Sequence, residues 1–574
     1  MLFNWKSGLV FCLLFFSLSV VSAAEVPVAA ISSEAGIVIR LKQPQETMQR
    51  ITRLTSQVDE NISGLLAANV RTIVGRSLSN PTWAGVDPTR DISVGVFLDA
   101  EQDPGLLFIV PIKDAAKLKE ALGEKYHSAV QDQWLIYSED QKLLEQAQAS
   151  LKQPEKSYES QLSSEAKTMF ASGDLALYLN LQKIVKIYHA QLERAEGQVD
   201  RALTDLSKKI NTAPGMNAKP ILGLYSTLAK GSLQAVKDSH AYTTAFQFSE
   251  KGIGLESLFE VEADSQTDRL FQTNPPRSFN QLGHFPAHQL AYIAGAGNTD
   301  ALITWGMNMT AQMFDETSQN AEARDKFMEI VKQIRSLKFG SYYFSFELGK
   351  LADGVMHAYT ISEVTPSDKM RTLTHQMMPI MKNISLPGIK QEITFTPDAE
   401  QAGGLPVDLT VIKQEIDPAS DPLQIQKRML EILYGPSGIT NRMAYPEGKV
   451  LQVMGGTASM QKFMDALNAP DKSSLIAQNQ SAFRQARARG ADKANILALI
   501  DVSGTVMRIL NIFAESRQQA GPFAEKQIRE LGIQDSYLTF SLTTGKQSLS
   551  TKTYIPVENL QNGFKVYSLI SRQK

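Results

Sequence analysis

The sequence is nearly free of cysteine. Its 574 residues contain one, Cys12, which lies within an apolar run at the N-terminus. If that run is removed on export, no thiol remains, which excludes disulfides, thiolate metal ligands and cysteine nucleophiles. Lipid attachment at Cys12 is not expected, because Phe11 stands where lipoprotein processing needs a small residue. A chain of this size without disulfides must be stabilised by its apolar core.

An excess of either charge is also missing. The chain has 58 Lys and Arg against 60 Asp and Glu, a formal charge of −2. Nucleic acid, which requires a basic stripe, is therefore not an expected partner. The densest basic stretch places Arg484, Arg487 and Arg489 around part of a helix. We interpret it as a solvated helix face, with contact to anionic lipid or a polyanion as the alternative.

Long hydrophobic runs are absent after the first residues. Lys6, an apolar run from Gly8 to Val21 and the small residues up to Ala24 form the pattern of a secretory signal peptide, residues 1–24, cleaved after Ala24. The alternative is an uncleaved anchor, but about 14 apolar residues are short for the roughly 20 of a spanning helix. Export without disulfides favours a bacterial periplasm, with secretion as the wider alternative.

The usual catalytic signatures are missing as well. There is no GxSxG, HExxH, GxxxxGK[ST] or GxGxxG motif after a strand. The stretch Gly295–Asp300 lies where a phosphate loop would lie, but it lacks the third glycine, so a plain turn is favoured. The sequence therefore predicts no catalytic residue, no cofactor-binding residue, no metal ligand and no cofactor.

Two stretches are candidates for metal sites. His284 and His288 are the closest pair of the seven histidines, but Pro286 between them argues against the helical face that a zinc pair needs. Thioether and imidazole ligands near His375 would suit copper. Core packing is favoured because four apolar residues around it fall at helical spacing: Met370, Leu373, Met377 and Met381.

Three carboxylates are candidates for other chemistry. Asp87 and Asp91 lie close together in an acidic stretch, but they supply too few oxygens for a calcium site, and a capped turn is the better interpretation. Asp501 follows a strand without a visible partner for acid–base work.

What the sequence does contain is a repeated pattern of a strand followed by a long amphipathic helix. In Gly173–Leu192 the run LALYLNL precedes apolar residues at helical spacing. The same switch occurs in three other stretches: Gly36–Leu54, His288–Met309 and Asn495–Phe513. In the last of these the predicted inward stripe comprises Val506, Ile509, Leu510 and Phe513.

A β-hairpin follows each of these helices. The predicted turns lie at Asp103–Gly105, Lys251–Gly252, Asp353–Gly354 and Gly545–Lys546. An additional strand and helix follow the first and third repeats, at Trp134–Leu151 and Val450–Leu467. This alternation indicates a duplicated chain.

The predicted fold is α+β, with duplicated halves that each hold two such repeats, and mainly antiparallel sheets covered by amphipathic helices. The halves are residues 25–275 and 276–574, joined by a linker at Gln272–His288. The second half carries an insertion at about 391–436. As an alternative to covering a sheet, the helices within 182–237 and 300–336 could project as αα-hairpins.

The stretches EAGIVIRLKQP, GVDPTRDISVGVFL and VPIKD, in the first quarter of the chain, resemble a family of exported bacterial proteins of unknown function. The resemblance implies an address in the bacterial envelope and no activity.

Our leading hypothesis is a non-catalytic binding or scaffold protein of the periplasm, acting through a surface or cleft between its similar halves on an unknown envelope protein, lipid or glycan. The alternative is an envelope hydrolase of an unrecognised class, whose site is dispersed in the sequence. The sequence does not decide whether the protein is an enzyme.

Overall fold

The computed structural model describes residues 28–211, 219–297, 318–381, 389–416, 424–456, 458–516 and 530–571. The predicted signal peptide lies outside these residues. The chain forms two compact units that are discontinuous in sequence. Unit 1 comprises Met1–Arg194, Gln234–Arg269 and Lys546–Phe564, and unit 2 comprises Ala195–Leu233, Leu270–Gly545 and Lys565–Lys574. The division into two contiguous halves stays a prediction.

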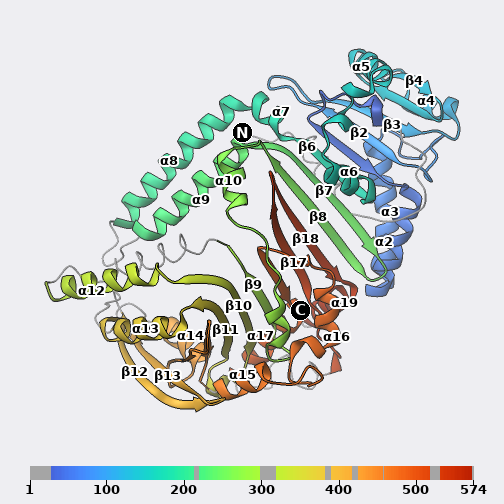
Figure 1. The fold of residues 1–574 in the computed structure, drawn as a ribbon. Helices are drawn as coiled ribbons and strands as arrows, with labels where there is room; N and C mark the ends of the chain where they lie inside the picture. The colour runs from blue at the N-terminus through green and yellow to red at the C-terminus, as the bar shows by residue number, and fades with distance from the viewer. Residues whose placement is uncertain are drawn as a thin grey trace. The chain divides into compact units, whose positions relative to one another are not determined.

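The described part of unit 1 is built on nine antiparallel strands in the order β4-β5-β3-β2-β1-β6-β7-β8-β18. Their bounds are β1 (Ile37–Leu41), β2 (Ile92–Phe97), β3 (Gly105–Pro111), β4 (His127–Gln131), β5 (Trp134–Ser138), β6 (Leu175–Asn180), β7 (Ser239–Ser249), β8 (Gly252–Val261) and β18 (Ser548–Pro556). Figure 1 traces these strands in blue, cyan, green and red.

Helices cover both faces of the central strands of unit 1. Alternate residues of a strand point to opposite faces, and here both sets are apolar and pack against helices. Leu107 and Ile109 pack in one cluster with α5 (Gln141–Lys152) and α6 (Ser164–Ser172). Phe108 and Val110 pack in another with α4 (Ala115–Leu122) and the end of α3 (Glu60–Ser77). The remaining long helix of this face, α2 (Pro44–Val58), begins with proline at its first position.

Unit 2 also has nine antiparallel strands among its described residues, in the order β12-β13-β14-β15-β11-β10-β9-β16-β17. Their bounds are β9 (Ala291–Gly295), β10 (Lys338–Leu348), β11 (Met356–Thr365), β12 (Ile389–Ala402), β13 (Leu405–Ile416), β14 (Ile439–Ala444), β15 (Lys449–Met454), β16 (Ile496–Ile500) and β17 (Leu538–Gly545). The α+β class predicted from the sequence is confirmed.

The helices of unit 2 again cover both faces of their strands. The larger cluster contains Tyr359, Leu451 and Val453 with α15 (Met460–Leu467) and α16 (Ser481–Arg487), and a second contains Val364 and Val450 with α12 (Ser318–Ile334) and α13 (Ser367–Met381). Helices α8 (His189–Asn211) and α9 (Lys219–Lys237) lie side by side (Figure 1), joined by an ion pair of 3.2 Å between Asp200 and Lys230. The other α-helices among the described residues, in either unit, are α7 (Leu181–Ile187), α10 (Gln266–Gln272), α14 (Ile425–Tyr434), α17 (Val502–Ser516) and α19 (Val557–Ser571). No helix among the described residues is long and apolar enough to cross a membrane.

The strands of the two units correspond in order and register. In unit 1 the Gly36 amide donates to Val96, and in unit 2 the Leu290 amide donates to Phe346 in the same way. With these bonds aligned, β4-β5-β3-β2-β1-β6-β7 matches β14-β15-β11-β10-β9-β16-β17, and β12 and β13 have no counterpart among the described strands of unit 1. An internal duplication would produce this pattern, and the duplication itself stays our prediction.

Two expectations from the sequence were wrong. The stretch Gln272–His288 was predicted to be a linker, but Phe279, Leu282 and Phe285 within it are fully buried in the core of unit 2. The helix α17 was predicted to point Val506 and Ile509 inward, but both are exposed. It instead packs Met507 and Leu510, because α17 has apolar residues on more than one face and periodicity alone does not choose between them.

Candidate functional site

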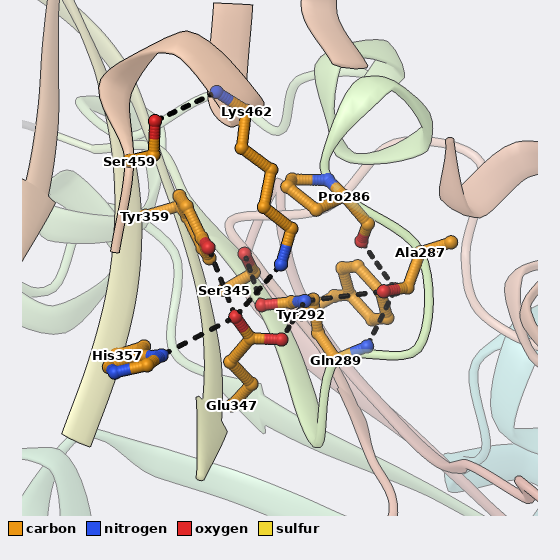
Figure 2. A network of polar contacts seen from close by, with 10 residues as sticks. All are labelled: Pro286, Ala287, Gln289, Tyr292, Ser345, Glu347, His357, Tyr359, Ser459 and Lys462. Carbon is orange, nitrogen blue, oxygen red and sulfur yellow. Dashed lines mark hydrogen bonds and ion pairs between the residues drawn. The ribbon is translucent and has the colours of Figure 1, made fainter. Parts of the chain in front are cut away.

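A network of polar side chains in unit 2 surrounds Glu347, near the end of β10 (Figure 2). Glu347 lies opposite His357, the second residue of the neighbouring strand β11. Tyr359 follows on β11, and Lys462 reaches the same point from the first turn of α15. Gln289 completes the network from the loop before β9.

Both carboxylate oxygens of Glu347 are occupied. Oε1 accepts hydrogen bonds from the Tyr359 hydroxyl at 3.0 Å and from Lys462 Nζ at 3.2 Å, and His357 Nδ1 lies 3.6 Å away. Oε2 accepts a hydrogen bond of 3.1 Å from Gln289 Nε2. A carboxylate with this many donors is a well-satisfied anion.

The electrostatics of the network fix the charge of Glu347. Burial acts to raise its pKa, but the close approach of His357 and the charge of Lys462 outweigh burial and lower the pKa from 4.5 to about 2. Burial and the adjacent carboxylate raise the pKa of the Tyr359 phenol, which therefore stays a donor. An acid that titrates near pH 2 is poorly matched to proton transfer at neutral pH, so this geometry favours a binding or structural role.

Close packing holds the donors in place. The His357 ring lies against two glycines: a Cβ at Gly349 or Gly455 would come within 2.5 and 2.6 Å of it. The Ser459 hydroxyl caps α15 by accepting from the Lys462 amide at 3.3 Å. Larger side chains at either glycine would displace the ring.

The corresponding place in unit 1 is apolar. The aligned register puts Ala35, Phe97 and Leu107 where unit 2 has Gln289, Glu347 and Tyr359. The helix residue over this strand pair is Leu143 of α5, where unit 2 has Lys462 of α15. The arrangement of strands therefore does not require the network, which is a feature of unit 2 alone.

A second distinctive feature of unit 2 is a groove of about 480 Å³ beside the insertion. One wall is the end of β13, from Ile412 to Ile416, and the other is the side of α14 that carries Lys427, Leu430 and Tyr434. No residue of α14 is fully buried, and Ile425 and Met429 are exposed. The stretch predicted to be an insertion, at about 391–436, contains β12, β13 and α14 in the structure.

The β13 wall of the groove is an open strand edge. Pairing between β13 and β14 ends at Ile412 and Ile439, whereas pairing with β12 continues to Ile416. Among the described residues, no strand pairs with Lys413–Ile416 on the side away from β12. Backbone groups on such an edge can hydrogen-bond to an added strand.

The two histidines considered from the sequence as a metal pair, His284 and His288, have different surroundings. His288 Nδ1 is 2.7 Å from Asp535 Oδ2 on the surface, and His284 lines a separate cavity of about 270 Å³. Within the described residues, no three His, Cys, Asp or Glu side chains come together as a possible metal site. Met370 and Met377 pack against the buried Leu373, consistent with the favoured core interpretation.

The other charged residues considered from the sequence have local partners. Arg484 donates to the carbonyls of Gln478 and Asn479, and Arg487 donates to those of Ala491 and Asp492. These bonds tie the arginine side chains to neighbouring backbone.

The acidic residues also have structural contacts. Asp87 accepts from Thr89, Asp91 forms a buried ion pair with Arg40, and Asp501 accepts from the Gly504 amide at the start of α17. Burial raises the pKa of Asp501 to about 6. The stretch Gly295–Asp300 lies partly outside the described residues.

Sequence reasoning missed a pair between α13 and the insertion, formed by His375 and Asp408. His375 Nε2 lies 2.6 Å from Asp408 Oδ2, and Asp408 is almost fully buried. Among the residues that the structure describes, no serine or threonine hydroxyl hydrogen-bonds to the other ring nitrogen of His375.

The Glu347 network could have been found only in part. Glu347 and His357 lie on the two strands of one predicted hairpin, so the turn places them within a residue or two of each other. Lys462 is 115 positions from Glu347 in the sequence, and no local pattern connects them.

Comparisons with known proteins add little. No protein family matches the chain, and no curated protein sequence matches it. A solved structure described as "Structure of crystal form III of TP0453" matches at 10% identity and a TM-score of 0.21, over 50% of this chain and 99% of that chain. Similarity of this degree supports no conclusion about fold or function.

Proposed function

We propose that this protein is a non-catalytic binding protein of the bacterial envelope, and that unit 2 holds an extended polypeptide segment in the groove between β13 and α14. The observation that carries the proposal is the open edge of β13 at Lys413–Ile416, which forms one wall of that groove. The predicted signal peptide supports the envelope address.

An extended polypeptide is the occupant that this geometry favours. A strand edge offers alternating backbone donors and acceptors, which only another extended backbone can match along its length. The facing wall adds apolar contacts from Leu430 and Tyr434, with Lys427 and Glu431 among its polar residues. Backbone pairing would supply affinity, and the side chains of α14 would supply selectivity.

This proposal moves the binding surface from a cleft between the halves, as the sequence suggested, to a groove within unit 2. The strands β12 and β13 that help to form the groove have no counterpart in the described part of unit 1, which is expected if the units differ in task. The observation that most favours the alternative, a hydrolase, is the His375–Asp408 pair, which would supply the base and the carboxylate of a catalytic triad.

The test is direct binding of synthetic peptides to the chain from Glu25 onward. Ten-residue peptides that alternate apolar and polar residues are screened on an array, and those that bind are labelled for fluorescence anisotropy. Leu430→Asp places a charge in the groove and is expected to weaken binding at least about tenfold.

Gln426→Asp is the matched control, because Gln426 is exposed on the same helix and does not line the groove. It introduces the same charge and is expected to leave affinity within about twofold. The proposal is wrong if no peptide binds, or if both substitutions weaken binding equally.

A further inference from the structure

A cleft of about 470 Å³ opens on unit 1, separate from the groove of unit 2 and independent of the function proposed for it. One side is a face of α2 whose residues recur at helical spacing: Gln45, Met48, Gln49, Thr52 and Arg53. The opposite face of α2 packs inward through Thr47, Ile51 and Leu54. The cleft is therefore lined mainly by residues of α2 that face away from Ile51 and Leu54, and only Pro44 and Met48 among them also pack against the core.

The floor of the cleft is apolar and fixed. Trp83 is nearly buried, and its indole Nε1 donates to the Arg71 carbonyl at 2.9 Å. Trp83 adopts a left-handed backbone conformation with φ of 60°, which is unusual for a residue with a side chain and is found often at functional sites. Met48, Pro44 and Pro88 complete the apolar lining.

The rim of the cleft is cationic. Arg71 is exposed on α3, and no described acidic side chain lies within ion-pair distance of it. Arg53 has an ion pair of 3.4 Å with Glu250, in which both side chains are more than half exposed, so that contact is weak. The amides of Gln45 and Gln49 add donors beside these charges.

We propose that this cleft binds an anionic amphiphile, with its apolar part against Met48 and Trp83 and its anionic group at Arg71 and Arg53. An apolar floor with a few polar groups at one side is the ordinary form of a small-molecule site, and the volume falls within the usual range. A guanidinium such as that of Arg71, which has no ion-pair partner among the described residues, favours a carboxylate or phosphate group on the ligand.

Isothermal titration calorimetry on the chain from Glu25 onward tests the proposal with three probes. Dodecanoate below its micelle concentration should bind with a stoichiometry of one. Dodecyltrimethylammonium, which has the same chain and the opposite charge, should bind at least about tenfold more weakly. Inorganic phosphate, which lacks the chain, should bind at least about tenfold more weakly than dodecanoate.

Substitutions at two positions of α3, Arg71 and Arg76, localise the site. Arg71→Gln should weaken dodecanoate binding about fivefold, the upper range for an exposed charge contact, while Arg71→Lys should retain part of the affinity. Arg76→Gln is the matched control, since Arg76 is exposed on the same helix outside the cleft, and it should change affinity less than about twofold.

Three results would overturn the inference: no dodecanoate binding, equal binding of the cationic amphiphile, or equal effects of Arg71→Gln and Arg76→Gln. Equal binding of phosphate and dodecanoate would overturn the amphiphile assignment, because the apolar floor would then contribute nothing.

Discussion

Unit 1 and unit 2 pair corresponding strands in the same order but place their buried charges differently. Unit 1 buries Arg40 on β1, paired with Asp91 before β2. The aligned positions of unit 2 are Ala294 and Ser341, which carry no charge. Around Glu347 the relation is reversed, because unit 2 is charged where unit 1 is apolar.

This difference separates what the fold needs from what it permits. A polar cluster that one unit replaces with neutral residues is not required by the strand order. Buried ion pairs contribute little net stability compared with apolar packing, but removing one partner is costly. Each cluster is therefore expected to be essential only within its own unit.

The largest effect is expected at the buried ion pair of unit 1. Arg40 donates to Asp91 and to the carbonyls of Phe170 and Ala171. Asp91→Ala leaves the guanidinium buried without its carboxylate and should lower the free energy of unfolding by about 3–5 kcal/mol, measured by urea denaturation. The control Ser341→Ala in unit 2 should cost no more than about 1 kcal/mol. Similar costs for both would contradict the comparison.

The next largest effects are expected for the helix residues that lie over the β2–β3 pair of unit 1 and the β10–β11 pair of unit 2. Exchanging Leu143 and Lys462 should lower the free energy of unfolding by a smaller amount, and by different amounts in the two units. Leu143→Lys places an ammonium group in the apolar cluster of unit 1 and should cost about 3 kcal/mol. The reverse change, Lys462→Leu, should cost about 1 kcal/mol, because Lys462 is half exposed and Glu347 keeps its other donors. Equal costs in urea denaturation would mean that the two environments do not differ as described.

One buried carboxylate in each unit should make stability depend on pH, and the two dependences should have opposite signs. Burial raises the pKa of Asp174 in unit 1 from 3.8 to about 7, although Lys42 and Arg50 oppose it. Its contribution to stability is therefore fully present below pH 3.8 and is lost as pH rises to about 7. The pKa of Glu347 is lowered to about 2, so its contribution is present above pH 4.5 and is lost as pH falls toward 2.

Unfolding free energies measured from pH 2 to pH 8 check this contrast. Asp174→Asn should flatten the profile between about pH 4 and 7, and Glu347→Gln should flatten it between about pH 2 and 4.5. A profile that either substitution leaves unchanged in its own window would show that the assigned carboxylate is not responsible.

The smallest stability effect is expected on α14. Ile425 and Met429 are exposed, so Ile425→Ser should change the free energy of unfolding by less than about 0.5 kcal/mol. Phe463→Ser on α15, fully buried in unit 2, provides the contrast and should cost about 3 kcal/mol or more in urea denaturation. A large loss at Ile425 would mean that α14 is part of the core rather than the wall of a groove.

Local patterns predicted much of the secondary structure. The hairpin turns lie where Asp353–Gly354 and Gly545–Lys546 indicated, because glycine and strand alternation act within a few residues. Strand β4 was not predicted, since His127–Gln131 is short and mostly exposed and has no apolar alternation. The charged clusters were also missed, because Arg40 meets Asp91, and Lys462 meets Glu347, only after strands or helices pair across distant parts of the chain.

Hydrogen–deuterium exchange along β13 tests the central claim that unit 2 carries an open strand edge for a polypeptide. In the free protein, amides within Lys413–Ile416 that face away from β12 should exchange faster than those of Val407–Ile412, which are paired on both sides. A peptide that binds should slow exchange at Lys413–Ile416 and leave Val407–Ile412 unchanged. Full protection of Lys413–Ile416 without peptide, or no change when peptide binds, would contradict the account.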